Sequence, residues 1–487
     1  MPAQIDPRAV LPELILSATI VLVIVADAFL RPSRRWLAMP LSLLGILAAL
    51  AAALSLVAVG LPRATFGGTF VVDRFALLFK VFFLSVAVVV LAISLRYVME
   101  GRFYQGEYYF LLLTSFLGCL LMPSSRDLLM LFISLELVSA PAFLIAAFRK
   151  TDVRSTEAGL KFFLIGVLST AVMLYGMSLV YGLTGATRLS DVAAGLAGLP
   201  PEREALAVAA ILFVVTGFAF KVSAVPFQFW APDTYEGAPV PVAAFLAVAS
   251  QAAGFAGLLQ LMFHAFIGQA GAWAPVFAAL SMATMTVGNL IALQQRQAIR
   301  LLAYSGIAQS GYMLLPFALA GAGSDVDRAA FSATVTYILI YAVMNLGAYA
   351  VCVAVARERP GLLISDFAGA ARRAPLLGVG MTLFMVSLAG VPPTGGFWAK
   401  FFVFTAAIER GGIGVWLAAI MVVNSVISLY YYLAIPRQMI FADGEERPLA
   451  APILVRGVVA VAAVGIVALF VFPDLLARAP QGATLVP

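Results

Sequence analysis

The 487-residue sequence has few charged residues, one histidine and two cysteines, and each shortage excludes a class of protein. Asp, Glu, Lys and Arg make up only 11% of the chain, whereas a typical soluble domain has about 25%. Hydrophobic residues make up 63%, which would expose more apolar surface than a soluble fold tolerates. The composition therefore predicts a polytopic membrane protein and excludes disordered, collagen-like and disulfide-scaffold proteins.

The scarcity of histidine and cysteine also argues against metal, haem and hydrolytic chemistry. Cys119 and Cys352 lie in separate apolar segments, and no metal-ligand spacing occurs in the sequence. His264 has no second histidine for haem ligation and no Ser or Cys partner for nucleophilic catalysis. No glycine-rich phosphate loop is present. We therefore expect neither a cofactor nor a metal in this chain.

The net charge of +6 is explained by membrane topology, and no basic stripe with interleaved aromatics indicates nucleic acid. Seventeen Arg and Lys residues lie in loops after odd-numbered apolar segments, and nine lie on the opposite face. This bias predicts that odd-numbered helices run from outside to inside, with both termini outside. Glu13 and Asp27 interrupt the first apolar segment, so we expect a retained helix with interfacial acids and not a cleaved signal.

Fourteen segments approach the roughly 20 apolar residues that a membrane-spanning helix needs. They are 9–30, 36–60, 72–97, 107–123, 127–148, 156–184, 204–225, 240–264, 273–295, 299–320, 328–356, 375–391 continuing to 410, 413–436 and 452–472. The linkers between them are short, which leaves no room for a soluble catalytic domain. The sequence therefore predicts an all-α polytopic fold of about fourteen transmembrane helices.

Two of these segments are interrupted by proline. Pro226 interrupts the seventh, and Pro392 and Pro393 interrupt the twelfth, where they leave the carbonyls of Leu388 and Ala389 without a helical donor. Paired broken helices in two halves of a chain are typical of transporters built from inverted repeats.

We therefore expect two inverted five-helix repeats, each with one broken helix. The predicted division is an N-terminal unit of three helices at 1–105, a first repeat at 106–270, a second repeat at 271–445 and a C-terminal helix at 446–487.

Four of the five lysines lie inside apolar segments: Lys80, Lys161, Lys221 and Lys400. An ionised side chain at the bilayer centre costs about 2.5–3.5 kcal/mol on insertion scales. Lysine changes its protonation readily when buried, whereas arginine stays charged. Lys221 and Lys400 adjoin the helix breaks, which favours a role in proton transfer. Lys80 is near its helix end and is expected to snorkel.

Glu136 lies in the middle of the fifth segment, where a lone carboxylate needs a partner. Lysine is the available partner type, and a pair about 4 Å apart is worth about 4 kcal/mol at an effective dielectric constant near 20. Lys161 follows Glu157 by four residues, so an ordinary helix-surface pair is an alternative to a proton-transfer role there. His264 is expected at the outer interface, with a proton relay as the alternative.

Three sequence segments besides that of Glu136 form a specific set. They read GFAFKVSAVPFQFWAPDTYEGAPVPVAAFLA at 217–247, RLLAYSGIAQSGYMLL at 300–315 and SLAGVPPTGGFWAKFFVF at 387–404. With this set the chain resembles the antiporter-like, proton-conducting membrane subunits of respiratory complex I. The resemblance covers nearly the whole chain and is strongest over 125–405.

The resemblance implies fourteen helices in two inverted repeats and proton-transfer roles for four residues: Glu136, Lys161, Lys221 and Lys400. It implies that flavin, iron–sulfur clusters and quinone belong to partner subunits. The expected partners are neighbouring antiporter-like and small membrane-arm subunits, in the lipid bilayer of a bacterial plasma membrane.

The sequence departs from the family pattern at two positions. Gln251 stands where the eighth helix usually has a lysine, and Gln309 stands where many relatives have histidine. Glutamine can hold a water chain but cannot store a proton. The link between Lys221 and Lys400 is therefore expected to depend on water, tyrosines or backbone groups, with Gln251, Gln309 and His264 as candidate relay positions.

The resulting prediction is a proton-translocating membrane subunit of a complex I-type NADH–quinone oxidoreductase. Two alternatives use the same fold and stay open from the sequence. One is a subunit of a multi-chain cation/proton antiporter. The other is a membrane subunit of a related hydrogenase- or ferredoxin-linked complex.

Overall fold

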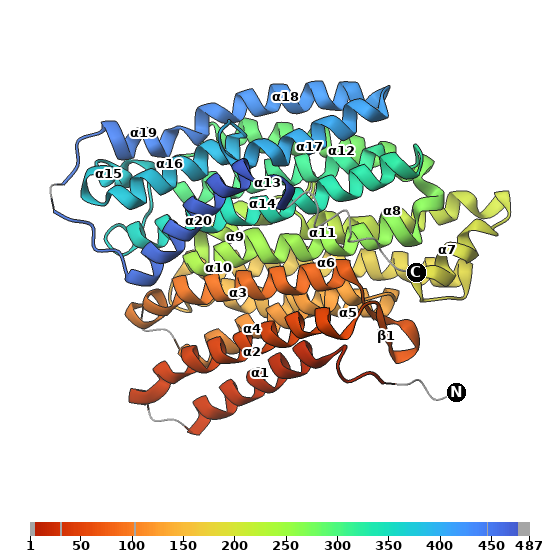
Figure 1. The fold of residues 1–487 in the computed structure, drawn as a ribbon, viewed down its shortest axis with the longest axis horizontal. Coiled ribbons are helices and arrows are strands. Elements are labelled where there is room, and N and C mark those ends of the chain that lie inside the picture. Colours follow the sequence, from red (N-terminus) through yellow and green to blue (C-terminus); the bar gives the residue numbers. More distant parts are fainter. Residues whose placement is uncertain (1–4, 30–31, 102–103, 446, 476–487) are drawn as a thin grey trace.

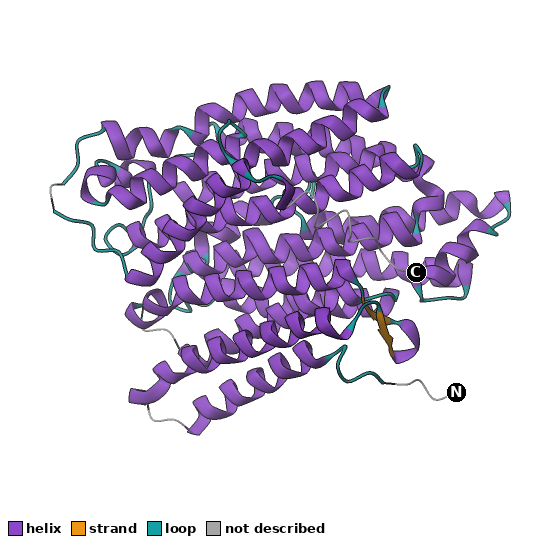
Figure 2. Cartoon of the chain, viewed as in Figure 1, coloured by secondary structure: helices purple, strands orange, loops and turns teal. Residues whose placement is uncertain are grey.

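The chain folds into a bundle of long helices that lie side by side (Figures 1 and 2). The computed structural model describes residues 5–29, 32–101, 104–445 and 447–475. Twelve helices in these ranges are long and apolar enough to cross a membrane. The prediction of an all-α polytopic membrane fold is confirmed.

The first half of the chain contains eleven α-helices and a short hairpin. The helices are α1 (Leu11–Phe29), α2 (Ala38–Val59), α3 (Arg74–Glu100), α4 (Gln105–Leu121), α5 (Leu128–Ala146), α6 (Val153–Thr184), α7 (Leu189–Ala197), α8 (Glu204–Lys221), α9 (Trp230–Gly237), α10 (Val240–Phe245) and α11 (Gln251–Gln260). The antiparallel strands β1 (Arg63–Thr65) and β2 (Phe70–Val72) pair in the register Arg63–Val72. This hairpin joins the second and third spans.

The second half contains nine α-helices: α12 (Ala270–Ala292), α13 (Ala298–Leu314), α14 (Ser324–Ala356), α15 (Ala370–Arg373), α16 (Pro375–Ala389), α17 (Gly395–Arg410), α18 (Ile413–Tyr432), α19 (Ala434–Phe441) and α20 (Ile453–Val471). Short 3₁₀ segments occur at Pro32–Leu37, Phe66–Gly68, Met122–Ser124, Pro201–Arg203, Ile267–Gln269, Leu315–Leu319 and Ile364–Phe367. Two π-helical turns, Leu246–Ser250 and Leu261–Ala265, flank α11 within one continuous span.

Twelve of the fourteen expected spans correspond to the twelve helices that are long enough to cross a membrane. The other two expected spans are interrupted and form shorter helices. The segment expected at 299–320 is α13 followed by the 3₁₀ turn Leu315–Leu319. The segment expected at 375–410 is two helices, α16 and α17, of 15 and 16 residues. The count of fourteen is therefore not established by helix length alone.

Polar side chains fix where several spans begin. Asp73 accepts a hydrogen bond from the Ala76 amide and caps α3, and Asp127 and Asp152 cap α5 and α6 in the same way. The first amide groups of a helix lack an internal partner, so such caps define the helix start. At the other end of α6, Gly185 adopts the left-handed conformation (φ +68°) that closes the helix.

Both predicted helix breaks are present. The seventh span, expected to reach residue 225, ends at Lys221, because Ser223 has a φ of +56° that no helix continues. The indole of Trp230 then donates to the Phe220 carbonyl at 3.1 Å. In the twelfth span, α16 ends at Ala389 and α17 begins at Gly395. Both breaks therefore lie within a few residues of the predicted prolines, and α8 ends four residues earlier than expected.

Most loops after the odd-numbered spans gather at one end of the bundle, with α15 and α19 (left in Figure 1). We call this the arginine-rich end. Ion pairs bind its loops together: Arg357 to Glu100 at 2.8 Å, Arg373 to Glu358 at 2.5 Å and Arg359 to Glu445. Arg31 and Arg102, which contribute to the predicted charge bias, lie outside the described residues.

The first three helices contain a buried ion pair that corrects two expectations. Lys80 of α3 is fully buried and donates to Oε1 of Glu13 in α1. Lys80 therefore does not snorkel, and Glu13 is a core residue and not an interfacial acid. Asp27 lies 3.8 Å from Arg35 and is largely buried beside it. Glu13 lies on the side of α1 that faces Lys80 of α3. The position of Glu13 near the end of its segment does not reveal which side it faces.

Candidate functional site

Lys221 is the last residue of α8 and has only 1% of its surface exposed. Its ammonium nitrogen donates to Ser139 Oγ of α5 at 2.8 Å. Its side-chain stem packs against Gly254 of α11, where a Cβ would lie 3.0 Å from Lys221 Cγ. A glycine at this position therefore makes room for the lysine.

Glu136 does not form the expected direct pair with a lysine. Among the described residues no ion pair involves Glu136, and its Oε1 has no hydrogen-bond partner. The charges of Glu136 and Lys221 interact electrostatically, and Glu136 also interacts with the Thr170 hydroxyl of α6. Ser139 follows Glu136 by three residues on the same helix, so the serine holds the lysine about one turn away from the carboxylate.

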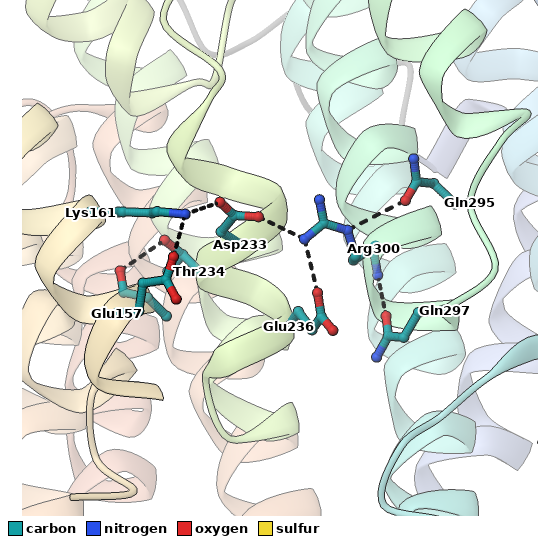
Figure 3. A network of polar contacts seen from close by, with 9 residues as sticks. Glu157, Lys161, Asp233, Thr234, Glu236, Gln295, Gln297 and Arg300 are labelled. Carbon is teal, nitrogen blue, oxygen red and sulfur yellow. Dashed lines mark hydrogen bonds and ion pairs between the residues drawn. The ribbon is translucent and has the colours of Figure 1, made fainter. Parts of the chain in front are cut away.

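Lys161 of α6 takes part in a charged network with α9 and α13 (Figure 3). Its ammonium contacts Glu157 Oε1 and Asp233 Oδ2, both at 2.7 Å. The other oxygen of Asp233 accepts from Arg300 Nη1 at 2.7 Å, and the same nitrogen lies 2.9 Å from Glu236. The helix-surface pair with Glu157 is therefore present, and Asp233 adds a second partner. Asp233 connects the two predicted repeats.

Burial raises the pKa of Asp233, but the hydrogen bonds from Lys161 and Arg300 outweigh burial and hold that pKa below its ordinary value of 3.8. Asp233 therefore stays ionised at neutral pH. Asp233, Glu236 and Arg300 were not among the site residues predicted from the sequence. The available signal was two acids three residues apart directly after a helix break, followed by an arginine at the start of another span.

Three buried aromatic rings contact one another, and two of them neighbour Lys161 and Lys221 in the sequence. Phe162, next to Lys161, stacks on Trp230 at 4.2 Å and 11°, and Phe220, next to Lys221, lies 5.2 Å from the same indole. All three rings are almost completely buried. These three rings form an apolar layer beside both lysines, and none of the three side chains can carry a proton.

Gln251 begins α11, directly after the π-helical turn Leu246–Ser250. It is 3% exposed, and its Oε1 has no hydrogen-bond partner among the described residues. Its amide nitrogen and the Tyr341 hydroxyl both lie near Gly306 of α13. A π-helical turn often marks a functional position because it disrupts the regular helix pattern.

Gln309 of α13 is the centre of a saturated hydrogen-bond cluster. Its amide nitrogen donates to the Leu388 carbonyl at 2.9 Å and to the Tyr432 hydroxyl at 2.8 Å. Its oxygen accepts from the Tyr337 hydroxyl at 2.5 Å, and Tyr432 also bonds to Ser305 at 2.6 Å. The carbonyl of Leu388 is one of the two groups that Pro392 and Pro393 leave without a donor.

The other such carbonyl, that of Ala389, accepts from the Lys400 ammonium at 2.8 Å. Lys400 also donates to Ser425 Oγ at 3.1 Å and lies 4.6 Å from the centre of the Tyr312 ring. It is 8% exposed and borders a cavity of about 380 Å³ between the helix break and α18. Lys400 therefore has carbonyl, hydroxyl and aromatic partners, and no carboxylate of the described residues pairs with it.

The polar groups between the two breaks follow one face of α13. Ser305, Gln309 and Tyr312 are spaced by four and three residues, so they lie on successive turns. The Tyr312 hydroxyl accepts from Asn289 Nδ2 at 3.0 Å, and the Tyr431 hydroxyl donates to Asn289 Oδ1 at 2.8 Å. Tyrosines and amides therefore occupy the region between Gln251 and Lys400.

His264 lies apart from the polar groups between Gln251 and Lys400. It is half-buried in the π-helical turn after α11, and its Nε2 has no partner among the described residues. The nearest charges are Arg126 and Asp73, which pair at 2.5 Å. No group of three or more His, Cys, Asp or Glu side chains in the described ranges is placed to hold a metal ion.

This chain is similar to known proteins over most of its length. A family model described as NADH:quinone oxidoreductase/Mrp antiporter, TM, matches residues 125–428. NADH-quinone oxidoreductase subunit N of Trichlorobacter lovleyi is 39% identical over 443 residues, which is 91% of this chain and 89% of that protein.

Solved structures show the same fold. A chain of respiratory complex I from Thermus thermophilus with bound aureothin superposes with a TM-score of 0.79 and 32% identity, over 96% of this chain and 98% of that one. A chain of the Mrp complex from Dietzia superposes with a TM-score of 0.84 at 20% identity, over 98% and 97%. The chain belongs to the NADH:quinone oxidoreductase/Mrp antiporter membrane family, together with proteins named NADH-quinone oxidoreductase subunit N.

Proposed function

We propose that this chain is subunit N of a complex I-type NADH–quinone oxidoreductase and moves protons across the membrane. The observation that carries the proposal is the placement of Lys221 and Lys400. Each is buried beside a helix break and held by neutral acceptors. A lysine without a carboxylate in contact can lose and regain its proton without breaking an ion pair, whereas a directly paired lysine holds its proton.

The proposed uptake step begins at Lys161, which is the most exposed of the three lysines, with 43% of its side chain accessible. Two carboxylates hold its proton at rest, so one of these ion pairs must open before Lys161 passes a proton on. The aromatic layer of Phe162, Phe220 and Trp230 adjoins both Lys161 and Lys221. In the proposed entry step these rings move apart and admit water, because none of them can carry a proton.

The coupling step is proposed at Glu136. A change in its charge alters the field at Lys221, which lies close enough for their charges to interact. The proton of Lys221 then passes toward Lys400 by way of Gln251, water and the tyrosine hydroxyls around Gln309. Hydroxyl groups can donate and accept at once, which lets them pass a proton along a chain. Release from Lys400 completes the transfer.

The proposed partners follow from the relatives. Flavin, iron–sulfur clusters and quinone are assigned to other subunits, and this chain supplies only proton transfer. Neighbouring antiporter-like and small membrane subunits are its proposed contacts. We propose a bacterial inner membrane with both termini on the outer side, in accordance with the arginine bias of the loops.

The test is Lys221→Ala, with Lys150→Ala as the matched control. Lys150 is a loop lysine with 66% of its side chain exposed. Its loss therefore removes a charge and leaves the buried polar groups from Lys221 to Lys400 unchanged. NADH:quinone turnover and proton uptake are measured in inverted membrane vesicles. We expect both to fall for Lys221→Ala and to stay unchanged for Lys150→Ala. Full turnover with full proton uptake in Lys221→Ala would contradict the proposal.

The two alternative functions are separated by purification from native membranes in mild detergent. Recovery with flavin- and iron–sulfur-bearing subunits and NADH:quinone activity supports the complex I assignment. Recovery with small membrane subunits alone, and Na⁺-dependent transport without NADH, supports an antiporter. Recovery with a hydrogenase or a ferredoxin-oxidising subunit supports the third assembly.

A further inference from the structure

A long apolar groove runs between α3, α14 and α20, away from the buried lysines Lys221 and Lys400. Its volume is about 520 Å³. Val89 of α3, Leu346 of α14 and Val461 of α20 form its walls, and no charged side chain lines it in the described part of the chain. The groove therefore joins the N-terminal three helices, the second half of the bundle and the last helix.

Glycines of α20 keep this groove open. A Cβ placed on Gly457 would meet nothing within 4 Å, and one on Gly465 would meet only Val343 Cγ1 at 3.5 Å. Glycine weakens a helix interior by about 0.5–1 kcal/mol relative to alanine. Close packing within the chain does not require either glycine. Their effect is to leave space beside α20.

The groove leads into a second pocket of about 410 Å³ at the arginine-rich end, lined by three charged and six apolar residues. Ile453 and Leu454 line both spaces, so the two are continuous. Arg357 in this pocket is already paired, because both oxygens of Glu100 accept from it at 2.8 Å and the Ala450 carbonyl accepts at 2.5 Å.

Arg96 lines the same pocket and is exposed. No hydrogen bond or ion pair joins it to another residue within the described ranges. Since Glu100 neutralises Arg357, Arg96 leaves one unmatched positive charge at the mouth of the groove. Arg96 also continues the face of α3 that carries Val89 and Ala92, so the charge stands directly above the apolar wall.

We propose that the groove and pocket together bind one anionic diacyl phospholipid from the membrane leaflet at the arginine-rich end of the bundle. The phosphate would contact Arg96, and an acyl chain would follow α20 past Gly457 and Gly465. Positive groups at the inner membrane surface attract anionic headgroups by about 1 kcal/mol each.

The test measures lipid retained by the purified full-length chain, and it does not depend on proton transfer. The chain is purified in mild detergent, exchanged into mixed phosphatidylglycerol and phosphatidylcholine micelles, and analysed by native mass spectrometry. We expect one retained phosphatidylglycerol per wild-type chain. Arg96→Ala should lower the preference for phosphatidylglycerol by about fivefold, which is the effect of one arginine near an anionic surface.

Gly457→Leu should abolish retention, because a Cβ at Gly457 meets nothing within 4 Å and the rest of the leucine side chain extends into the groove. The matched control is Gly182→Leu in α6, where a Cβ also meets nothing within 4 Å. Its lipid retention should equal that of the wild type. Equal retention in Gly457→Leu, or equal affinity of the wild type for both lipids, would overturn the proposal. Loss of a co-purifying polypeptide instead of lipid in Gly457→Leu would assign the groove to a protein partner and overturn it as well.

Discussion

The Lys221 ammonium donates to the Ser139 hydroxyl at 2.8 Å, and this contact keeps it off Glu136. Ser139 in turn donates to the Leu135 carbonyl at 2.7 Å, so its oxygen is free to accept from the lysine. A direct lysine–carboxylate pair would fix the proton on the lysine. The intervening serine leaves Lys221 responsive to the charge of Glu136 without a bond that must break first.

Asp233→Asn should reduce proton uptake more than either neighbouring substitution. Asp233 is the one carboxylate in the described network that contacts both Lys161 and Arg300. Glu157→Gln removes a partner of Lys161 only, and Glu236→Gln removes a partner of Arg300 only. Proton uptake in vesicles compares the three variants. An effect of Asp233→Asn no larger than that of the single-partner variants would show that the link between the repeats is unimportant.

The Asp233 contacts should persist to acidic pH. Its pKa in the folded chain is lowered below 3.8, so its contribution to stability is fully present above that value. That contribution is lost only as the pH falls through the lower folded-state pKa. Infrared difference spectra of wild type minus Asp233→Asn should show the protonated carboxyl band only below about pH 3.8. A band that appears between pH 5 and 7 would contradict this assignment.

Gly390→Ala should impair proton transfer by displacing Lys400. A Cβ at Gly390 would lie 2.7 Å from Lys400 Cδ, and Gly390 has a φ of +86°. Gly185→Ala is the matched control, because Gly185 shares the left-handed conformation (φ +68°) but has open space around it. Both variants carry the backbone cost of about 1–2 kcal/mol. Vesicle proton uptake should fall several-fold only for Gly390→Ala.

Lys80→Met should destabilise the N-terminal helices by about 3–5 kcal/mol, because it leaves the buried Glu13 carboxylate without its partner. The double variant Glu13→Gln with Lys80→Met should recover most of that loss, since no buried charge remains. Lys150→Ala, which breaks an exposed pair with Glu107, should cost at most about 1 kcal/mol. Denaturant unfolding in detergent measures all three. Equal stability of Lys80→Met and wild type would show that the pair contributes nothing.

Gln309→Leu should slow proton transfer and destabilise the chain. The change removes the acceptor of the Tyr337 hydroxyl and the donor to the Leu388 carbonyl. Each unsatisfied buried group costs about 1–3 kcal/mol. Gln309→His restores a donor and an acceptor and should keep proton uptake close to wild type. The ratio of protons moved to NADH oxidised separates the two variants, and an unchanged ratio in Gln309→Leu would exclude this position from the route.

The sequence alone specified the features that depend on local chemistry. Proline cannot donate a backbone hydrogen bond. Pro226, Pro392 and Pro393 therefore mark both helix breaks, and this signal does not depend on how the segments pack in the fold. Apolar segments long enough to cross a bilayer as a helix predict membrane spans, and lysines inside those segments predict buried charges. The fold class and the positions of Lys221 and Lys400 beside the breaks followed from these local properties.

Only the tertiary structure decided which partner each charged group has. Lys161 meets Asp233 across 72 residues, and Lys80 meets Glu13 across 67. Such contacts depend on the rotation and height of each helix relative to its neighbours, and shifting a helix by one residue rotates a side chain by about 100°. Composition does not encode that rotation. It is set by close packing, such as the fit of Gly254 against Lys221.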